Sequence, residues 1–162
     1  MRSVIPENAN VMALTATATK STRSDIIKAL NMQNPVIVSI PPIKDNLYYC
    51  VSEKSTVALS LSPICEKLAI ERTRMGRIVI FCRKYDEVTA IYYFFKQKMG
   101  LGFTEPPGAP DLAQFHLVDM YTHCTHQSVK DKILSQFTTT SPLRIVIATI
   151  AFGMGIDCPD VR

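Results

Sequence analysis

Tryptophan is absent from the 162 residues, glycine occurs only six times, and the five cysteines form no Cys-x-x-Cys pair. An odd number of widely spaced cysteines argues against a disulfide framework and indicates a reducing, intracellular compartment. No apolar run approaches the roughly 18 residues that a transmembrane helix needs. Residues 1–10 lack the basic and then apolar order of a secretory signal. We therefore expect neither a disulfide-stapled secreted protein nor a membrane protein.

Apolar content and charge define what remains. Hydrophobic residues make up 47% of the chain and charged residues 20%, which suffices for a buried core in one domain or slightly more. The net charge is +4, and its whole excess lies between Glu66 and Lys98, which hold eight basic and four acidic residues. Such a segment indicates either a basic face toward phosphates or an ordinary solvated helix face.

Apolar runs of strand length alternate with segments of helical periodicity. The expected strands cover residues 10–15, 35–40, 47–51, 77–82, 115–121 and 144–149. The first expected helix begins at a cap on Ser21 or Thr22, and the second begins near Ser62, with Pro63 in its first turn. The third begins at Asp86 and ends at Gly100 as its C-cap, and the last covers residues 128–137. Run 77–82 is of the continuous apolar type that is buried on both faces of a parallel sheet. The alternation predicts an α/β fold with its chemistry at the carboxyl ends of the strands, after Thr15, Cys82, Tyr121 and Thr149.

The strongest chemical signal runs from Ala148 to Asp157. A buried strand ends at Thr149, and a loop with Gly153 and Gly155 follows it. Glycine lets the backbone approach a phosphate, and successive N–H groups can bind an anion. Thr149 can donate to a phosphate oxygen, and Asp157 can accept from a sugar hydroxyl. A simple glycine turn between a strand and a helix fits the same spacing, so the spacing leaves both interpretations open.

Four segments carry a resemblance to a known family. Residues 144–162, RIVIATIAFGMGIDCPDVR, closely resemble motif V of the RecQ family of superfamily 2 DNA helicases. Residues 13–18, ALTATA, resemble its motif III, and residues 77–82, RIVIFC, resemble its motif IV. Residues 45–48, DNLY, are similar to the stretch that enters the family's second RecA-like domain. The proline-rich insertion at 106–110 departs from the family's pattern.

The resemblance implies a fold, an activity and a set of partners. The fold is α/β, a RecA-like parallel sheet flanked by helices, of the P-loop NTPase type. Residues 1–40 would be the C-terminal end of the first RecA-like domain, and residues 41–162 the second one, ending before motif VI. The activity is that of an ATP-dependent 3′–5′ DNA helicase acting in repair, recombination or replication. Its partners are single-stranded and duplex DNA, and ATP with Mg²⁺ in the intact parent protein. The location is the nucleus in a eukaryote and otherwise the cytoplasm.

Two sets of residues carry roles by the same resemblance. The nucleotide-cleft and coupling set is Thr15, Thr17, Gly155 and Asp157. The DNA-binding set is Arg83, Lys84, Thr149, Phe152 and Gly153. From the residues alone, the two threonines of motif III also fit packing under a sheet, and the basic pair also fits a solvated loop.

Parts of the motor are missing from these residues. Hydrolysis of ATP needs a phosphate loop of the form GxxxxGK[ST]. The first glycine is Gly76, so Lys20 and Ser21 cannot belong to such a loop. Asp86 and Glu87 start a helix and are interpreted as its N-terminus, not as the motif II carboxylates. We expect no catalytic residue in this chain and no ATP hydrolysis by it alone. The alternative function is a non-catalytic module that binds single-stranded nucleic acid or a partner.

Three further groups have weaker signals. His123, Cys124 and His126 lack the paired spacing of a zinc site, so no metal is expected. Cys82 is predicted to be a buried structural thiol, because no His or Asp partner for a nucleophile is indicated. The aromatic cluster at 92–95 has helical spacing and is predicted to be mostly core, with base stacking as the alternative.

Overall fold

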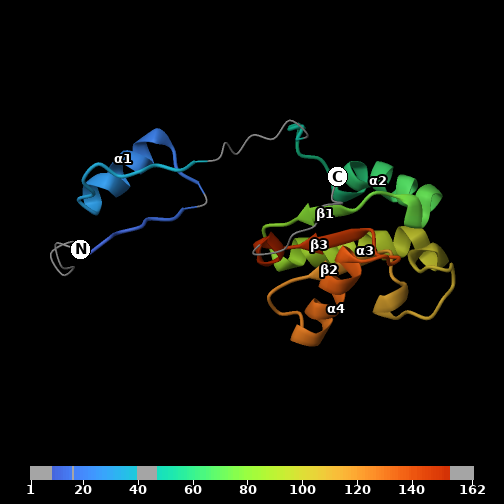
Figure 1. The fold of residues 1–162 in the computed structure, drawn as a ribbon. Helices are drawn as coiled ribbons and strands as arrows, with labels where there is room; N and C mark the ends of the chain where they lie inside the picture. The colour runs from blue at the N-terminus through green and yellow to red at the C-terminus, as the bar shows by residue number, and fades with distance from the viewer. Residues whose placement is uncertain (1–8, 16, 40–46, 154–162) are drawn as a thin grey trace. The chain divides into compact units, whose positions relative to one another are not determined.

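The computed structural model describes residues 9–15, 17–39 and 47–153, and it divides into two compact units (Figure 1). Unit 1 is Met1–Val51 and unit 2 is Ser52–Arg162. Across the described part of the chain, no helix combines the length and the apolar character needed to cross a bilayer.

Unit 1 holds a single described helix, α1 (Lys20–Ala29). Its N-cap is Thr19, whose side-chain oxygen accepts a hydrogen bond from the Thr22 amide. The predicted caps, Ser21 and Thr22, were wrong because Thr19 is the residue with extended backbone angles, φ −66° and ψ 167°. Only that geometry lets a side-chain oxygen turn back onto the first free amides of a helix.

The strands predicted in unit 1 are absent from its described residues. No strand forms at residues 10–15, 35–39 or 47–51. Their apolar side chains are largely exposed, among them Leu14 and Val36. No residue of α1 is buried. A strand needs a neighbour to satisfy its N–H and C=O groups, and the described residues of unit 1 provide none. The prediction from apolar runs was therefore wrong for these segments.

Unit 2 is built on a parallel sheet of three strands, β1 (Ile78–Phe81), β2 (Val118–Tyr121) and β3 (Ile145–Ala148). The strand order is β1-β3-β2, so the last strand in sequence lies between the other two. The prediction of a parallel α/β sheet is confirmed. The observed strands are shorter than the predicted ones, by one residue at each end of β1 and β3 and by three residues at the start of β2.

β1 and β3 show that sequence alone does not decide burial. Both begin from the same run, Arg-Ile-Val-Ile. All four residues of β3 are buried, because β3 is the central strand. β1 is an edge strand of the described sheet, its first three residues are only partly buried, and Phe81 is 58% exposed. β1 packs against both cores, through Ile78 and Ile80 on one face and Val79 on the other, but it is only partly buried and not fully buried as predicted.

Three helices flank the sheet: α2 (Val57–Glu71), α3 (Tyr85–Met99) and α4 (Gln127–Thr138). Helix α2 starts five residues before the predicted Ser62, because the Thr56 side chain caps it by accepting from the Leu59 amide. Pro63 lies inside α2, not in its first turn. Helix α3 starts at Tyr85, one residue before the predicted Asp86.

The end of α3 follows the prediction. Gly100 is its C-cap, with φ 52° and ψ −125°, a backbone region that favours glycine. Four short 3-10 helices complete the described unit: η2 (Arg72–Arg74), η3 (Gly100–Phe103), η4 (Ala113–Phe115) and η5 (Ile150–Gly153).

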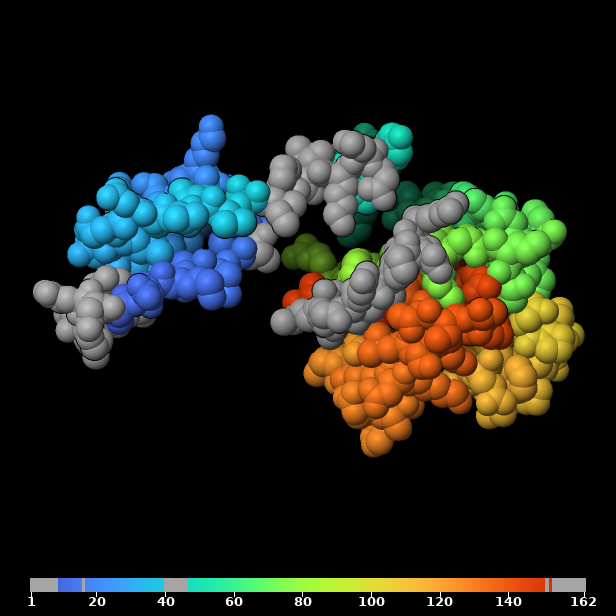
Figure 2. Space-filling model, in the orientation of Figure 1, coloured from blue at the N-terminus to red at the C-terminus, as the bar shows by residue number. Residues whose placement is uncertain are grey.

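Two apolar cores cover the two faces of the sheet. Ile145 and Ile147 of β3 point into the first core, which α2 and α3 close with Leu68, Val88 and Phe95 among others. Val146 and Ala148 point into the second core, which α4 closes with Ile133 and Phe137. In space-filling view the residues of unit 2 form one closely packed body (Figure 2). This packing holds the strand ends at fixed positions.

The aromatic cluster at 92–95 is mostly core, as predicted. Tyr92 and Phe95 are buried, Phe94 packs against the first core, and Tyr93 is half exposed. Cys82 is also buried, and burial raises the pKa of its thiol. A raised pKa keeps a thiol protonated and unreactive, which agrees with a structural role.

Candidate functional site

The carboxyl ends of the three strands lie side by side, because Phe81 and Tyr121 both pair in register with Ala148. The chain leaves the sheet at three neighbouring points, and we call the connections that follow the carboxyl edge. They are residues 82–84 after β1, 122–126 after β2 and 149–153 after β3. Ligands of open parallel sheets bind at this edge.

The connection after β1 carries an exposed basic pair, Arg83 and Lys84. The backbone amides of both donate to one carboxylate oxygen of Glu87, at 3.0 Å and 3.2 Å. The bond from Lys84 and then the bond from Arg83 lower the pKa of Glu87, so it stays ionised. Since Glu87 occupies these amides, an anion at this point would have to be held by the two basic side chains.

The connection after β2 is held by local hydrogen bonds. The Thr122 amide donates to the Thr125 hydroxyl oxygen at 3.0 Å, and the two hydroxyls lie 3.2 Å apart. Lys130 donates to the His123 carbonyl at 3.0 Å and lies over the ring of Tyr121. Sequence reasoning missed Thr122, Thr125 and Lys130. For Thr122 and Thr125 the available signal was their position directly after a buried strand; Lys130 lies within α4 and had no such signal.

The histidines and the cysteine of this connection serve local structure. His126 caps α4, because its Nδ1 accepts from the Ser128 amide at 3.4 Å. The Cys124 sulfur lies 3.1 Å from His123 Nε2. Among the residues that the structure describes, no group of three or more His, Cys, Asp or Glu could hold a metal ion.

The connection after β3 turns back on itself. The Phe152 amide donates to the Thr149 carbonyl at 3.1 Å. The Phe152 side chain is only 3% exposed and packs edge-on against Tyr121 and Phe137, with ring centroids 5.0 Å and 5.7 Å away. Its ring therefore anchors the turn in the second core, and any ligand contact of this residue would come from its backbone.

Two more of the predicted site residues lie in the turn after β3. Thr149 is partly exposed at the start of this turn, and Gly153 ends η5. Gly155 and Asp157 lie outside the described residues. The structure thus brings the basic pair and Thr149 to adjacent strand ends, where the Cys82 amide donates to the Ala148 carbonyl at 2.8 Å.

Thr15 and Thr17 lie in unit 1, and both are exposed. The Thr15 hydroxyl donates to the Thr17 carbonyl at 2.8 Å and accepts from the Thr17 amide at 3.3 Å. Both threonines line a hollow of about 790 Å³ beside α1, with Arg23 and apolar side chains in the same wall. The described residues do not show these threonines packed under a sheet, so this alternative is not supported.

The positive charge at 66–98 does not form one face. Half of its eight basic side chains bind within unit 2. Arg72 pairs with Glu105, Lys67 with Glu71 and Lys96 with Asp111, and Arg77 donates to the Thr139 carbonyl. Of the eight, only Arg83 and Lys84 lie on the carboxyl edge. The segment as a whole therefore gives little support to a phosphate-facing surface, and the part that fits one is the pair Arg83 and Lys84.

Comparisons with known proteins agree with this geometry. The helicase conserved C-terminal domain family matches residues 60–162, which include all three strands and the carboxyl edge. Human "ATP-dependent DNA helicase Q4" is 28% identical over 152 residues, covering 93% of this chain and 12% of that protein. "ATP-dependent DNA helicase RecQ" of Pasteurella multocida is 29% identical over 162 residues, covering 100% of this chain and 22% of that protein. The chain thus spans only a small part of these relatives.

A solved structure shows the same fold. The structure of S. cerevisiae Dbp5 bound to RNA and ADP BeF3 superposes with a TM-score of 0.64 at 16% sequence identity. The match covers 99% of this chain and 36% of that one. At this identity the likeness concerns the fold alone, and it confirms the predicted α/β, RecA-like type.

Proposed function

The chain belongs to the helicase conserved C-terminal domain family, and from this premise we propose that it is the DNA-tracking part of an ATP-dependent 3′–5′ helicase of the RecQ type. In this proposal the carboxyl edge of unit 2 holds a single strand by its phosphates. The observation that carries it is the placement of Arg83 and Lys84 beside Thr149 on paired strands.

The chemistry of this edge suits phosphates better than bases. It offers two cationic side chains, a threonine hydroxyl and the backbone amides of a turn. The one aromatic ring of the turn, Phe152, is buried. Contacts to phosphates fix a strand's position but do not read its sequence. Binding should therefore weaken steeply with salt and depend little on base sequence.

DNA is the proposed polymer because both curated relatives named above are called DNA helicases. The Dbp5 structure contains RNA, and phosphate contacts alone do not distinguish the two. Discrimination would need a group that senses the 2′-hydroxyl. We expect DNA and RNA strands to compete for the same edge, and the experiment below includes both.

ATP enters through the names of the relatives, which are ATP-dependent. We propose ATP with Mg²⁺ for the intact protein, with Gly155 and Asp157 at the nucleotide and with Thr15 and Thr17 coupling nucleotide state to DNA. The 162 residues contain no GxxxxGK[ST] loop, and the described residues fit no magnesium cluster. No hydrolytic step is assigned to this chain, which we expect to bind nucleic acid without hydrolysing ATP by itself.

The wider setting is proposed on the same grounds. Residues 1–40 would end a first RecA-like domain, and residues 41–162 would form the second. A role in repair, recombination or replication would place the protein in the nucleus of a eukaryote or in the cytoplasm of a bacterium. A binding module without catalysis is the second candidate. The two candidates make different predictions for the intact protein. A helicase would use ATP to move along the nucleic-acid strand, whereas a binding module would only hold it.

The experiment is a salt titration of binding to fluorescein-labelled dT20, rU20 and duplex DNA, followed by anisotropy. We expect the Arg83→Ala, Lys84→Ala double variant to lose about tenfold or more in affinity for dT20 at low salt. The slope of log K against log salt should fall by roughly 1.4, because about 0.7 is lost for each phosphate contact to a single strand.

The matched control is Arg74→Ala with Lys98→Ala, which removes the same charge. Arg74 lies in η2, before β1, and Lys98 lies in the last turn of α3. Both are therefore at the opposite end of the strands. Equal losses in the two double variants would show non-specific attraction and contradict the proposal.

A further inference from the structure

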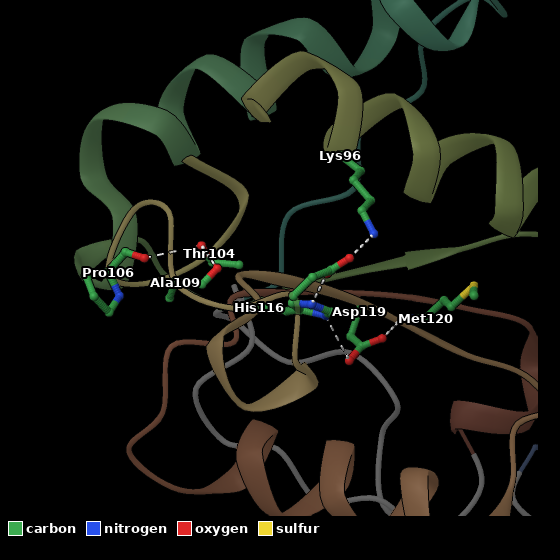
Figure 3. A network of polar contacts seen from close by, with 8 residues as sticks. Lys96, Thr104, Pro106, Ala109, His116, Asp119 and Met120 are labelled. Carbon is green, nitrogen blue, oxygen red and sulfur yellow. Dashed lines mark hydrogen bonds and ion pairs between the residues drawn. The ribbon is translucent and has the colours of Figure 1, made fainter. Parts of the chain in front are cut away.

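The segment 100–116 joins α3 to β2 and contains the insertion that departs from the family pattern. Its two ends are clipped together by a bridge between Thr104 and His116, with the Leu117 amide donating to the Phe103 carbonyl at 3.1 Å. Thr104 is buried, and its hydroxyl donates toward the carbonyls of Pro106 and Ala109 (Figure 3). The segment is therefore a built structure, and what fixes it to the sheet can be identified.

His116 is the polar centre of this attachment. Its side chain is only 9% exposed, and Nε2 lies 2.8 Å from a carboxylate oxygen of Asp111. The other carboxylate oxygen of Asp111 accepts from Lys96 of α3 at 2.7 Å. The imidazole also stacks at a tilt on Phe103, with centroids 5.1 Å apart. On this side the ring bonds Asp111, and Asp111 in turn bonds Lys96 of α3.

The other side of the ring faces β2. His116 Nδ1 lies 3.9 Å from Oδ2 of Asp119, whose side chain is 11% exposed (Figure 3). Asp119 Oδ1 accepts from the Met120 amide at 2.8 Å. Within the described part of the chain, neither His116 Nδ1 nor Asp119 Oδ2 has a hydrogen-bond partner, and both atoms are buried. A buried carboxylate oxygen without a donor is costly. A proton on Nδ1 of His116 would provide a positive charge and a donor that face Asp119 Oδ2.

We propose that His116 is a proton-operated latch that fixes segment 100–116 to the body of unit 2. With both ring nitrogens protonated, one N–H bonds Asp111 and the other points at Asp119, so one cation serves two carboxylates. When the ring loses a proton, one nitrogen becomes an acceptor and faces a carboxylate. The segment then loses its charged attachment to β2, while the Lys96–Asp111 and Arg72–Glu105 pairs remain.

The surroundings set the direction of the pH dependence. Burial lowers the pKa of His116, but the nearby carboxylates of Asp119 and Asp111 outweigh burial, and the pKa is raised. The other charged or titratable groups nearby are Lys96 and Tyr92 of α3, and Glu105, which Arg72 neutralises. Lys96 is already shared with Asp111 and lowers the pKa of that carboxyl.

The sign follows from linkage. A histidine whose folded pKa is raised contributes its full stabilisation below the unfolded value of about 6.5, and the contribution is lost as pH rises through the folded pKa. The latch is therefore closed in mildly acidic solution and released toward alkaline pH.

The experiment uses the full chain and two readouts from NMR. The first is the titration of the His116 Cε1–H signal. The second is hydrogen exchange of the Glu105 and Leu117 amides, which bond within the clip. We expect His116 to titrate above about 6.5 and the protection factors, corrected for intrinsic rates, to fall at least about threefold across the same pH range.

Variants separate a latch from ordinary packing. Asp119→Asn should lower the pKa of His116, and His116→Gln should abolish the pH step in exchange. The control is His126→Gln, at an exposed histidine that caps α4, and it should leave the step in place. If His116→Gln does not fold, the wild-type titration and Asp119→Asn still decide. A His116 pKa at or below its ordinary value, or amide protection that is independent of pH, would overturn the proposal.

Discussion

At the scale of single residues, Glu87 controls the charge where β1 leaves the sheet. Its carboxylate satisfies the amides of both Arg83 and Lys84 and so shapes the turn into α3. It also places a negative charge beside the only basic pair on the carboxyl edge. The same contact therefore supports the fold and opposes the binding of phosphates.

Glu87→Gln tests this double role. The amide oxygen of glutamine can still accept from the two backbone amides, but the charge is gone. We expect affinity for dT20 to rise about two- to threefold at low salt, as expected for one exposed unit charge within several ångströms, and to converge with wild type at high salt. The measurement is the anisotropy titration used above.

The same variant has a consequence for acid stability. The pKa of Glu87 is lowered, so its contribution is present above the unfolded value of about 4.3 and is lost as pH falls through the folded value. Denaturant unfolding at neutral and acid pH should show a smaller pH difference in Glu87→Gln than in wild type. Glu66→Gln on α2 is the control, and a weaker affinity of Glu87→Gln for dT20 would count against this account.

The sequence predicted the position of a residue correctly where that position follows from the residue's place directly after a strand. Arg83 and Lys84 follow a run that any parallel sheet would end at this edge. It failed where geometry decides, as at Thr19, which caps α1 in place of Ser21 or Thr22. The burial of Phe152 was also beyond the sequence, because only the folded turn brings its ring onto Tyr121 and Phe137.

At the scale of elements, Arg72 joins the end of α2 to the segment after α3. Its guanidinium pairs with Glu105 at 2.6 Å and donates to the carbonyls of Gly102, at 2.8 Å, and Thr104. Its backbone has φ 52° and ψ −124°, a region that side chains rarely adopt. Such a conformation costs of order 1–3 kcal/mol, and the three contacts offset that cost.

Replacement of Arg72 should reveal both the stabilisation from its side-chain contacts and the cost of its strained backbone. Arg72→Ala is expected to destabilise unit 2 by about 2 kcal/mol or more, because hydrogen bonds to charged groups contribute roughly 1.5–3 kcal/mol each. Arg72→Gly should cost less than Arg72→Ala, because glycine removes the backbone strain. Arg72→Lys should not restore stability, since an ammonium cannot reproduce the planar fork. Chemical denaturation of the full chain measures all three.

The neighbouring Arg74→Ala serves as the reference, because an exposed substitution in η2 should stay within about 0.5 kcal/mol. Equal stability of Arg72→Ala and Arg74→Ala would mean that the contacts to segment 100–105 contribute nothing. A less stable Arg72→Gly than Arg72→Ala would show that the backbone at this position is not strained.

The elements were predictable to different degrees. Strands of unit 2 and the end of α3 at Gly100 follow from β-branched runs and from the backbone freedom of glycine. The start of α2 did not, because Pro63 was expected in a first turn beginning near Ser62, whereas the Thr56 cap starts the helix at Val57, five residues earlier. The identical runs of β1 and β3 differ in burial only through strand order, which depends on contacts distant in sequence.

At the scale of the whole molecule, the two units differ in how they are stabilised. Unit 2 buries two apolar cores on a parallel sheet. In unit 1, α1 has no buried residue, and its apolar segments are largely exposed. Short helices without packing are marginal in water. The proposed binding function therefore rests on unit 2, and the coupling roles of Thr15 and Thr17 stay a prediction.

The central claim is that a nucleic-acid strand lies along the carboxyl edge of unit 2. The most direct test is to record amide NMR shifts of the full ¹⁵N-labelled chain while adding dT12. The account predicts that the largest changes cluster in residues 82–84, 122–126 and 149–153. Amides beside Arg77 and Arg144, before the strands, should not move. Saturable binding with its shift changes gathered before the strands, or on the outer faces of α2 and α3, would contradict the account.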